Sequence, residues 1–250
     1  MIRIIPKAVL LAGMLLPAAL SAFGQDSAAA PEFDVASIKP AVLQAGQAFG
    51  VGCVSRNPIL FICTNAPLRM LVVLAYGIDH NLVSGPAWID SQRFHVNAKV
   101  PPGSSDEQIH LMLRQLLADQ LGLAVHRETR EMQVYALVVG KGGSKLKDSQ
   151  QSAPLQLAQH NHVTELAARG CAISGLVSVL QSHLDRHVMD ETGLTGSYDF
   201  TLSFGDDSGA AMAPSVFSAV QNQLGLKLEA KKAPTEVLVV DKAGKAPSAN

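Results

Sequence analysis

The sequence of 250 residues is poor in aromatic side chains and lacks any cluster of basic residues. Phe, Tyr and Trp together make up 5% of it, so a platform of stacked rings for carbohydrate is not indicated. Twenty Lys and Arg residues stand against 21 Asp and Glu residues, and they are spread along the chain. This balance makes nucleic acid an unfavourable partner.

The common motifs of hydrolases and nucleotide-binding proteins are missing as well. The chain has no GxSxG sequence and no Gly-rich phosphate loop. We therefore expect no cofactor and favour a protein without catalytic activity.

Long apolar runs are absent beyond the N-terminus. Residues 1–24 have a basic start, an apolar stretch and small residues before Gln25, which is typical of a cleaved signal peptide. The apolar stretch is shorter than the roughly 20 residues that span a bilayer, although a membrane anchor is the alternative. We expect an exported protein, periplasmic or extracellular, without stable membrane insertion after cleavage.

The chain has only three cysteines. Cys53 and Cys63 flank a predicted turn, and an exported chain meets oxidising conditions, so their spacing favours a hairpin disulfide over two buried thiols. Cys171 is left over, as a buried small side chain, an intermolecular partner or a replacement for one member of the pair.

What the sequence does contain is a repeated order of elements. Apolar residues alternate along residues 94–100 and again along residues 198–204, which predicts two half-buried strands. The sequence Gln-Leu-Gly-Leu occurs at residues 120–123 and 223–226, after helical patterns. We predict an α+β protein with two similar α-β-α-β(β) units, each a small sheet covered by two helices.

These patterns divide the chain as follows. After a mobile leader (residues 25–32), the first unit with an N-terminal strand covers residues 33–140. A polar linker or long surface loop (residues 141–168) precedes the second unit (residues 169–243), and residues 244–250 form a tail. Within the first unit, Ser105 and Gln108 predict a capping box, and residues 124–127 and 134–139 predict two strands around a polar link.

Two histidines are weak candidates for metal ligands. His183 and His187 are four residues apart on a predicted helix, a spacing that lets two imidazoles face one ion. Leu184 stands where a zinc protease needs a Glu. Two solvated histidines on a polar helix face are the preferred interpretation, and no metal is expected.

Short motifs in a fixed order run along nearly the whole mature chain. They are FDVASIKP from residue 33, LRML from 68, AYGI from 75, GPAWID from 85, LLAD from 116, HRETRE from 126, YALVV from 135 and QLGL from 223. With these motifs the chain resembles a large family of exported bacterial proteins of unknown function, abundant in acidobacteria. The resemblance implies export and a two-part α/β body, with no established activity. The helix–strand units are also similar, in architecture alone, to short N-terminal domains of secretins and TonB-dependent receptors.

The sequence leaves the function open between three classes. The first is a non-catalytic module that binds a protein, peptide or envelope component, with Trp88, Arg93, His126 and Arg127 as weak binding candidates. The second is a metal- or thiol-dependent hydrolase that uses His183 and His187, or Cys171. The third is a structural envelope protein.

Overall fold

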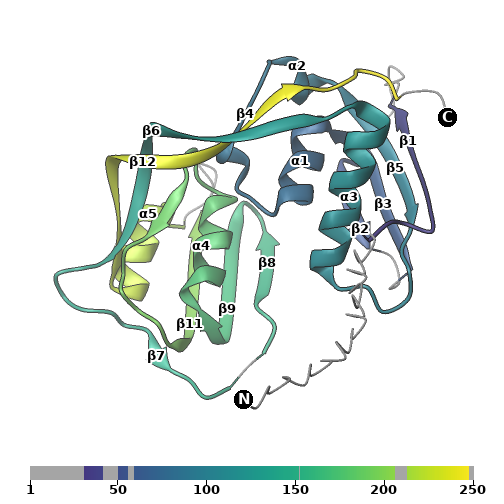
Figure 1. Cartoon of the computed structure of the whole chain (residues 1–250). Coiled ribbons are helices and arrows are strands. Elements are labelled where there is room, and N and C mark those ends of the chain that lie inside the picture. The colour runs from purple at the N-terminus through teal and green to yellow at the C-terminus, as the bar shows by residue number, and fades with distance from the viewer. Residues whose placement is uncertain (1–30, 42–49, 56–58, 152, 206–212, 248–250) are drawn as a thin grey trace, which may run out of the picture. The chain divides into compact units, whose positions relative to one another are not determined.

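The computed structural model describes residues 31–41, 50–55, 59–151, 153–205 and 213–247 (Figure 1). The predicted signal peptide, most of the predicted leader and the end of the tail lie outside these residues. Two hydrophobic cores form, one from each half of the chain. None of the described helices is long and apolar enough to cross a membrane.

The first half forms a four-stranded sheet in the order β1-β5-β3-β2, with helices α1 and α3 packed on its apolar face. Its elements are β1 (Val35–Pro40), β2 (Gly52–Ser55), β3 (Leu60–Pro67), α1 (Leu68–Tyr76), η1 (His80–Leu82), β4 (Val83–Ser84), α2 (Trp88–Ser91), β5 (Arg93–Lys99), α3 (Asp106–Leu121) and β6 (Ala124–Val139). The predicted capping box is confirmed, because Ser105 and Gln108 exchange side-chain-to-backbone hydrogen bonds at the start of α3.

The second half forms another four-stranded sheet in the order β7-β11-β9-β8, which we call the second sheet. Helices α4 and α5 pack against its apolar face. The elements of the second half of the chain are β7 (Lys147–Asp148), β8 (Gln156–His160), β9 (Val163–Ala172), α4 (Ile173–Gln181), β10 (Val188–Asp190), β11 (Ser197–Gly205), α5 (Val216–Ala219), the single-turn π-helix η2 (Val220–Leu224) and β12 (Leu226–Lys242). The α+β class with two similar units is thus confirmed.

The two sheets match strand for strand. In both, the middle strands are antiparallel neighbours (β5 with β3, β11 with β9), and β1 and β7 take one edge while β2 and β8 take the other. Residues 141–168, predicted as a polar linker, therefore contain β7, β8 and the start of β9. Periodicity misses β7 and β8 because both are short edge strands with mostly exposed side chains.

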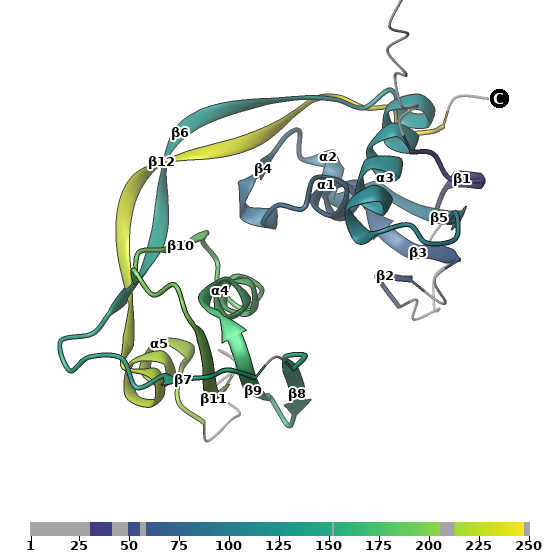
Figure 2. The same cartoon turned by 60° about the horizontal axis from the view of Figure 1, so that its bottom comes forward.

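The longest strands, β6 and β12, pair with each other along their whole length (Figure 2). The polar link predicted within β6 is wrong, because residues 128–131 continue the strand opposite residues 234–237 of β12. β6 is polar there, and cross-strand partners such as Arg127 and Glu236 replace its apolar alternation. The short strands β4 and β10 extend this ribbon on its two sides, β4 beside β12 and β10 beside β6.

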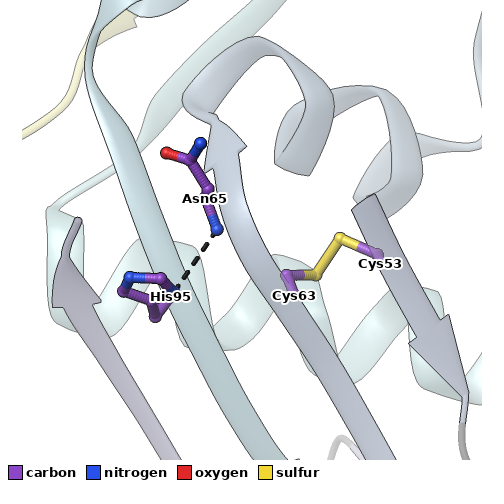
Figure 3. Close-up of a disulfide and its surroundings, with 4 residues drawn as sticks. All are labelled: Cys53, Cys63, Asn65 and His95. Atoms are coloured by element: carbon purple, nitrogen blue, oxygen red, sulfur yellow. Dashed lines mark hydrogen bonds between the residues drawn. A yellow bond between two sulfur atoms is a disulfide. The ribbon is translucent and has the colours of Figure 1, made fainter. Parts of the chain in front are cut away.

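Each sheet contains a bulge just before its first helix. Asn65, with φ of 52°, donates its N–H to His95 Nδ1 (3.3 Å; Figure 3). Arg93 Nη1 donates to the Asn65 carbonyl oxygen (3.1 Å). In the second sheet, Gly170, with φ of 66°, donates its N–H to Asp199 Oδ1 (2.8 Å). A side chain of the neighbouring strand therefore satisfies the bulged N–H in both halves.

The disulfide between Cys53 and Cys63 is confirmed. The two residues lie directly opposite each other on β2 and β3, with Sγ atoms 2.02 Å apart and Cα atoms 4.0 Å apart (Figure 3). It ties the edge strand β2 to the sheet, whereas β8, at the same position in the second sheet, has no such bond. Cys171 is a free, partly buried thiol.

We expect the alternation along β11 to control stability. Phe200 is buried in the second core, while Thr201 is exposed on the other face. Phe200→Ala should lower the free energy of unfolding by about 3–5 kcal/mol, and Thr201→Ala by less than about 1 kcal/mol. Urea titration of both variants measures the contrast, and equal losses would contradict the strand register.

The bulges give a second prediction. Asn65 adopts a left-handed conformation, and its buried Oδ1 atom has no hydrogen-bond partner among the described residues. Asn65→Gly removes the strain and the unsatisfied atom, and should stabilise the protein by about 0.5–1 kcal/mol. Gly170→Ala is the matched control and should destabilise by about 1–2 kcal/mol, because it places a Cβ in the same conformation. A lower urea midpoint for Asn65→Gly would show that its side chain is needed.

Candidate functional site

The second sheet has an outer face on which small side chains lie in the middle. Thr201 and Ala167 are exposed there, Ala158 and Ser203 are partly exposed, and longer side chains surround them. Two hollows of about 320 Å³ each lie on this face, and both are lined by Thr201 and Gln223. We call these joined hollows the trough.

The walls of the trough come from five elements. One hollow is lined by β8, β9, β11 and Gln223 of η2, and the other by β7, β9, β11 and the end of η2. Gln223 fixes one side: its Oε1 accepts from the Ser203 N–H (2.9 Å) and its Nε2 donates to the Ser203 carbonyl (2.8 Å). This amide occupies the free backbone edge of β11 beyond β7.

At the edge of the second sheet away from β7 lies β8, an edge strand with the sequence QLAQH. The strand contains no Lys, Glu or Pro, the residues that discourage an edge strand from pairing with another strand. Leu157 is 55% exposed at this edge. A peptide in the trough could thus also contact an apolar side chain and free backbone groups of β8.

One end of the trough is cationic. Lys147 and Arg169 line it and are exposed, and neither forms an ion pair or side-chain hydrogen bond within the described chain. Asp199 is the carboxylate in this hollow. Hydrogen bonds from Ser149 and from the Gly170 N–H, with the charges of Arg169 and Lys147, hold the pKa of Asp199 below its ordinary value.

A second, smaller pocket of about 230 Å³ adjoins His187. Its lining comes from the region around η1, from His187 and from the middle of the β6–β12 ribbon. The residues are Ile78, Leu82, His187, Arg127, Thr235, Glu236, Val237 and Leu238. Arg127 pairs with Glu236 at its rim. Of the candidates named from sequence, this pocket brings Arg127 and His187 together.

The partner of His187 is Asp79, a residue that the sequence analysis did not single out. The Asp79 side chain is 2% exposed, and it accepts hydrogen bonds from His187 Nδ1 (2.9 Å) and the Asn81 N–H (3.1 Å). Burial acts to raise the pKa of Asp79. The bonds from His187 and Asn81, with the charges of His187 and His80, outweigh burial and hold that pKa below its ordinary value.

Two side chains lie beside Nδ1 of His187: Asp79 Oδ2 and the Gln181 Nε2 amide nitrogen, each at 2.9 Å. A proton on Nδ1 suits the carboxylate, and it leaves Nε2 as an acceptor without a partner in the described chain. An Asp–His pair of this kind can orient an imidazole for proton transfer. No hydroxyl or thiol nucleophile hydrogen-bonds to His187 in the described residues.

The helix expected to carry both His183 and His187 ends before them. Helix α4 ends at Gln181, so the two histidines do not share a helical face. His183 Nδ1 lies 3.0 Å from the Val179 carbonyl oxygen, and its ring packs edge-on against Phe204. The described residues contain no group of three His, Cys, Asp or Glu side chains suited to a metal ion.

The other candidates lie apart and have structural partners. Trp88 packs against the first core, with Lys245 above its ring (5.6 Å to the centroid). Arg93 holds the Asn65 bulge. His126 Nδ1 lies 2.8 Å from Asp241 Oδ1, and this bond, with a further one to the Glu128 carboxylate, raises the pKa of the exposed His126 against the effect of desolvation.

Cys171 lacks the setting of a reactive thiol. Burial raises the pKa of its thiol, whereas a nucleophilic cysteine needs a lowered one. Its Sγ donates to the Ala172 carbonyl oxygen (3.4 Å) beside the start of α4.

Comparison with known proteins identifies one family. The family described as "Protein of unknown function (DUF3738)" matches residues 69–243, which include α1 to β12. The chain belongs to this family. Both the trough and the Asp79–His187 pair of this DUF3738 protein lie within the matched residues. No curated protein and no solved structure matches the chain, and the architectural likeness to secretins and TonB-dependent receptors stays an expectation.

The trough and Asp79 were missed for different reasons. The residues in the middle of the trough are small, so they carry no motif, and Ala158 and Ala167 lie in the predicted linker. Asp79 follows α1 at the N-cap of η1, where an Asp is an ordinary turn residue. Both the trough and the Asp79–His187 pair form only when segments far apart in the sequence come together in the fold.

The Asp79–His187 bond predicts a pH-dependent contribution to stability. Because the folded pKa of Asp79 is lowered, its contribution is present above the unfolded value, about 3.9, and is lost as the pH falls through the folded value. Asp79→Asn should cost about 1–3 kcal/mol at pH 7, and the gap to wild type should close below about pH 4.

The matched control is Asp148→Asn, at an exposed carboxylate with no side-chain partner in the described chain. It should leave stability nearly unchanged at every pH. Urea titrations at pH 3, 5 and 7 measure both variants. A gap between Asp79→Asn and wild type that stays constant with pH would contradict the role of the charged carboxylate.

Proposed function

We propose that this protein is an exported binding module that receives an extended segment of a partner protein or peptide in the trough. The observation that carries the proposal is the outer face of the second sheet, where exposed small side chains leave two joined hollows. A hollow of this size takes only a few side chains, so the partner contributes a short stretch of chain.

Two further features support a peptide as the partner. The edge strand β8 borders the trough with free backbone groups and no charged side chain, and such edges pair with extended segments. In contrast, the equivalent edge strand β2 is held by the Cys53–Cys63 disulfide. Export accords with this disulfide and with the apolar segment in residues 1–24.

An enzyme is the second candidate, and the Asp79–His187 pair is the observation that favours it. The pair supplies an oriented imidazole beside a pocket. The metal- and thiol-dependent versions have less support, because His183 lies elsewhere and the pKa of Cys171 is raised. A binding role requires no catalytic group, and the trough is the larger and more open site.

Selection of peptides tests the binding role. A phage-displayed library of random dodecapeptides is selected on the protein without residues 1–24, and selected peptides are labelled with fluorescein for anisotropy. Ala167→Arg places a long side chain in the middle of the trough. We expect it to weaken binding at least about 10-fold, equal to about 1.4 kcal/mol.

The matched control is Asn97→Arg, an exposed position on the middle strand β5 of the first sheet. It adds the same side chain and charge away from the trough, and peptides should bind it as they bind wild type. Selected peptides that bind Ala167→Arg with unchanged affinity would overturn the proposed site. Failure to select any peptide would count against the proposed function.

A further inference from the structure

The positive charge at one end of the trough indicates the chemistry of the segment that binds there. Several cations of the described chain are neutralised by a nearby carboxylate: Arg69 by Asp90, Lys99 by Asp34, Arg127 by Glu236 and Lys231 by Glu191. Lys147 and Arg169 line one hollow and share a single nearby carboxylate, Asp199, with which neither forms an ion pair in the described chain. Two unpaired cations at one binding surface leave a positive potential that an anionic group can satisfy.

The nearby carboxylate cancels only part of this potential. Asp199 accepts hydrogen bonds from Gly170 and Ser149, so its oxygens are occupied in holding the bulge. Lys145 adds a third positive charge at the rim, with its Nζ donating to the Asn222 carbonyl oxygen (2.7 Å). Three cations and one carboxylate leave this hollow with a formal charge of +2.

The other hollow differs in character. Leu157, Leu166 and Leu202 contribute to its lining, and the acidic residue at it is Glu165. The trough therefore joins an apolar hollow to a cationic one, and Thr201 and Gln223 line both. A bound segment has to carry apolar side chains at one end and negative charge at the other.

We propose that the trough recognises an acidic peptide segment, with Asp or Glu side chains placed at Lys147 and Arg169 and apolar side chains beside β8. This inference rests on the proposed function and adds the chemistry of the partner. Arg169 offers a planar fork that binds a carboxylate through two N–H groups, while Lys147 contributes a point charge. Both residues act as specificity determinants rather than as the main source of affinity.

The experiment uses the selected dodecapeptides and a double variant, Lys147→Gln/Arg169→Gln. We expect Asp and Glu to be enriched in the selected peptides, and the double variant to bind them about 5- to 20-fold more weakly, in the range for two exposed ion pairs. Wild-type affinity should fall as NaCl is raised from 50 to 500 mM, and the double variant should respond less.

The matched control is Lys39→Gln/Lys232→Gln, which removes two exposed positive charges on β1 and β12, outside the trough. It should bind the peptides as wild type does. Replacing the acidic residues of a peptide by amides should weaken binding to wild type but have little further effect on the Lys147→Gln/Arg169→Gln variant. That pattern would locate the carboxylates at these two cations.

Three outcomes would overturn the inference, and they separate it from the proposed function. Peptides that lose binding on Ala167→Arg but not on the double charge variant would leave the binding role intact and refute the acidic preference. Peptides that bind the Ala167→Arg variant as tightly as wild type would refute both the proposed binding site and the acidic preference. Phosphatidylglycerol vesicles that bind through Lys147 and Arg169, with no acidic peptide selected, would assign the surface to a lipid headgroup instead.

Discussion

The pairing of β6 with β12 is the constraint on which the rest of the fold depends. β6 begins next to the first core and contributes Tyr135 and Leu137 to the second. β12 begins in the second core and ends with Leu238 and Val240 in the first. Because each core contains a strand from the other half, neither half buries its apolar face completely with its own residues alone.

The ribbon also positions the two short strands that complete it. β4 belongs to the first half but pairs with β12, and β10 belongs to the second half but pairs with β6. His187 directly precedes β10, and its carbonyl oxygen accepts the Tyr135 N–H. The contact of His187 with Asp79 is therefore set by this backbone pairing as well as by the side chains.

The two halves have the same bulge before their first helix, and different side chains accept its N–H. His95 accepts the bulged N–H in the first sheet and Asp199 accepts it in the second, while the bulged residues are Asn65 and Gly170. The halves diverge where they are exposed. The first sheet has a disulfide at its edge strand, and the second has an unprotected edge and a hollowed outer face, which is why the proposed binding site lies in the second half.

The sequence by itself determined the elements whose side chains face a core. Alternation along β5 and β11, the capping box of α3 and the spacing of Cys53 and Cys63 all depend on neighbours close in the chain, and local patterns record them. Only the tertiary structure decided the continuity of β6, the strands β7 and β8, the separation of His183 from His187 and the joining of the trough. These features depend on residues far apart in the chain, whose own side chains are polar, small or exposed, and such positions leave no periodic signal.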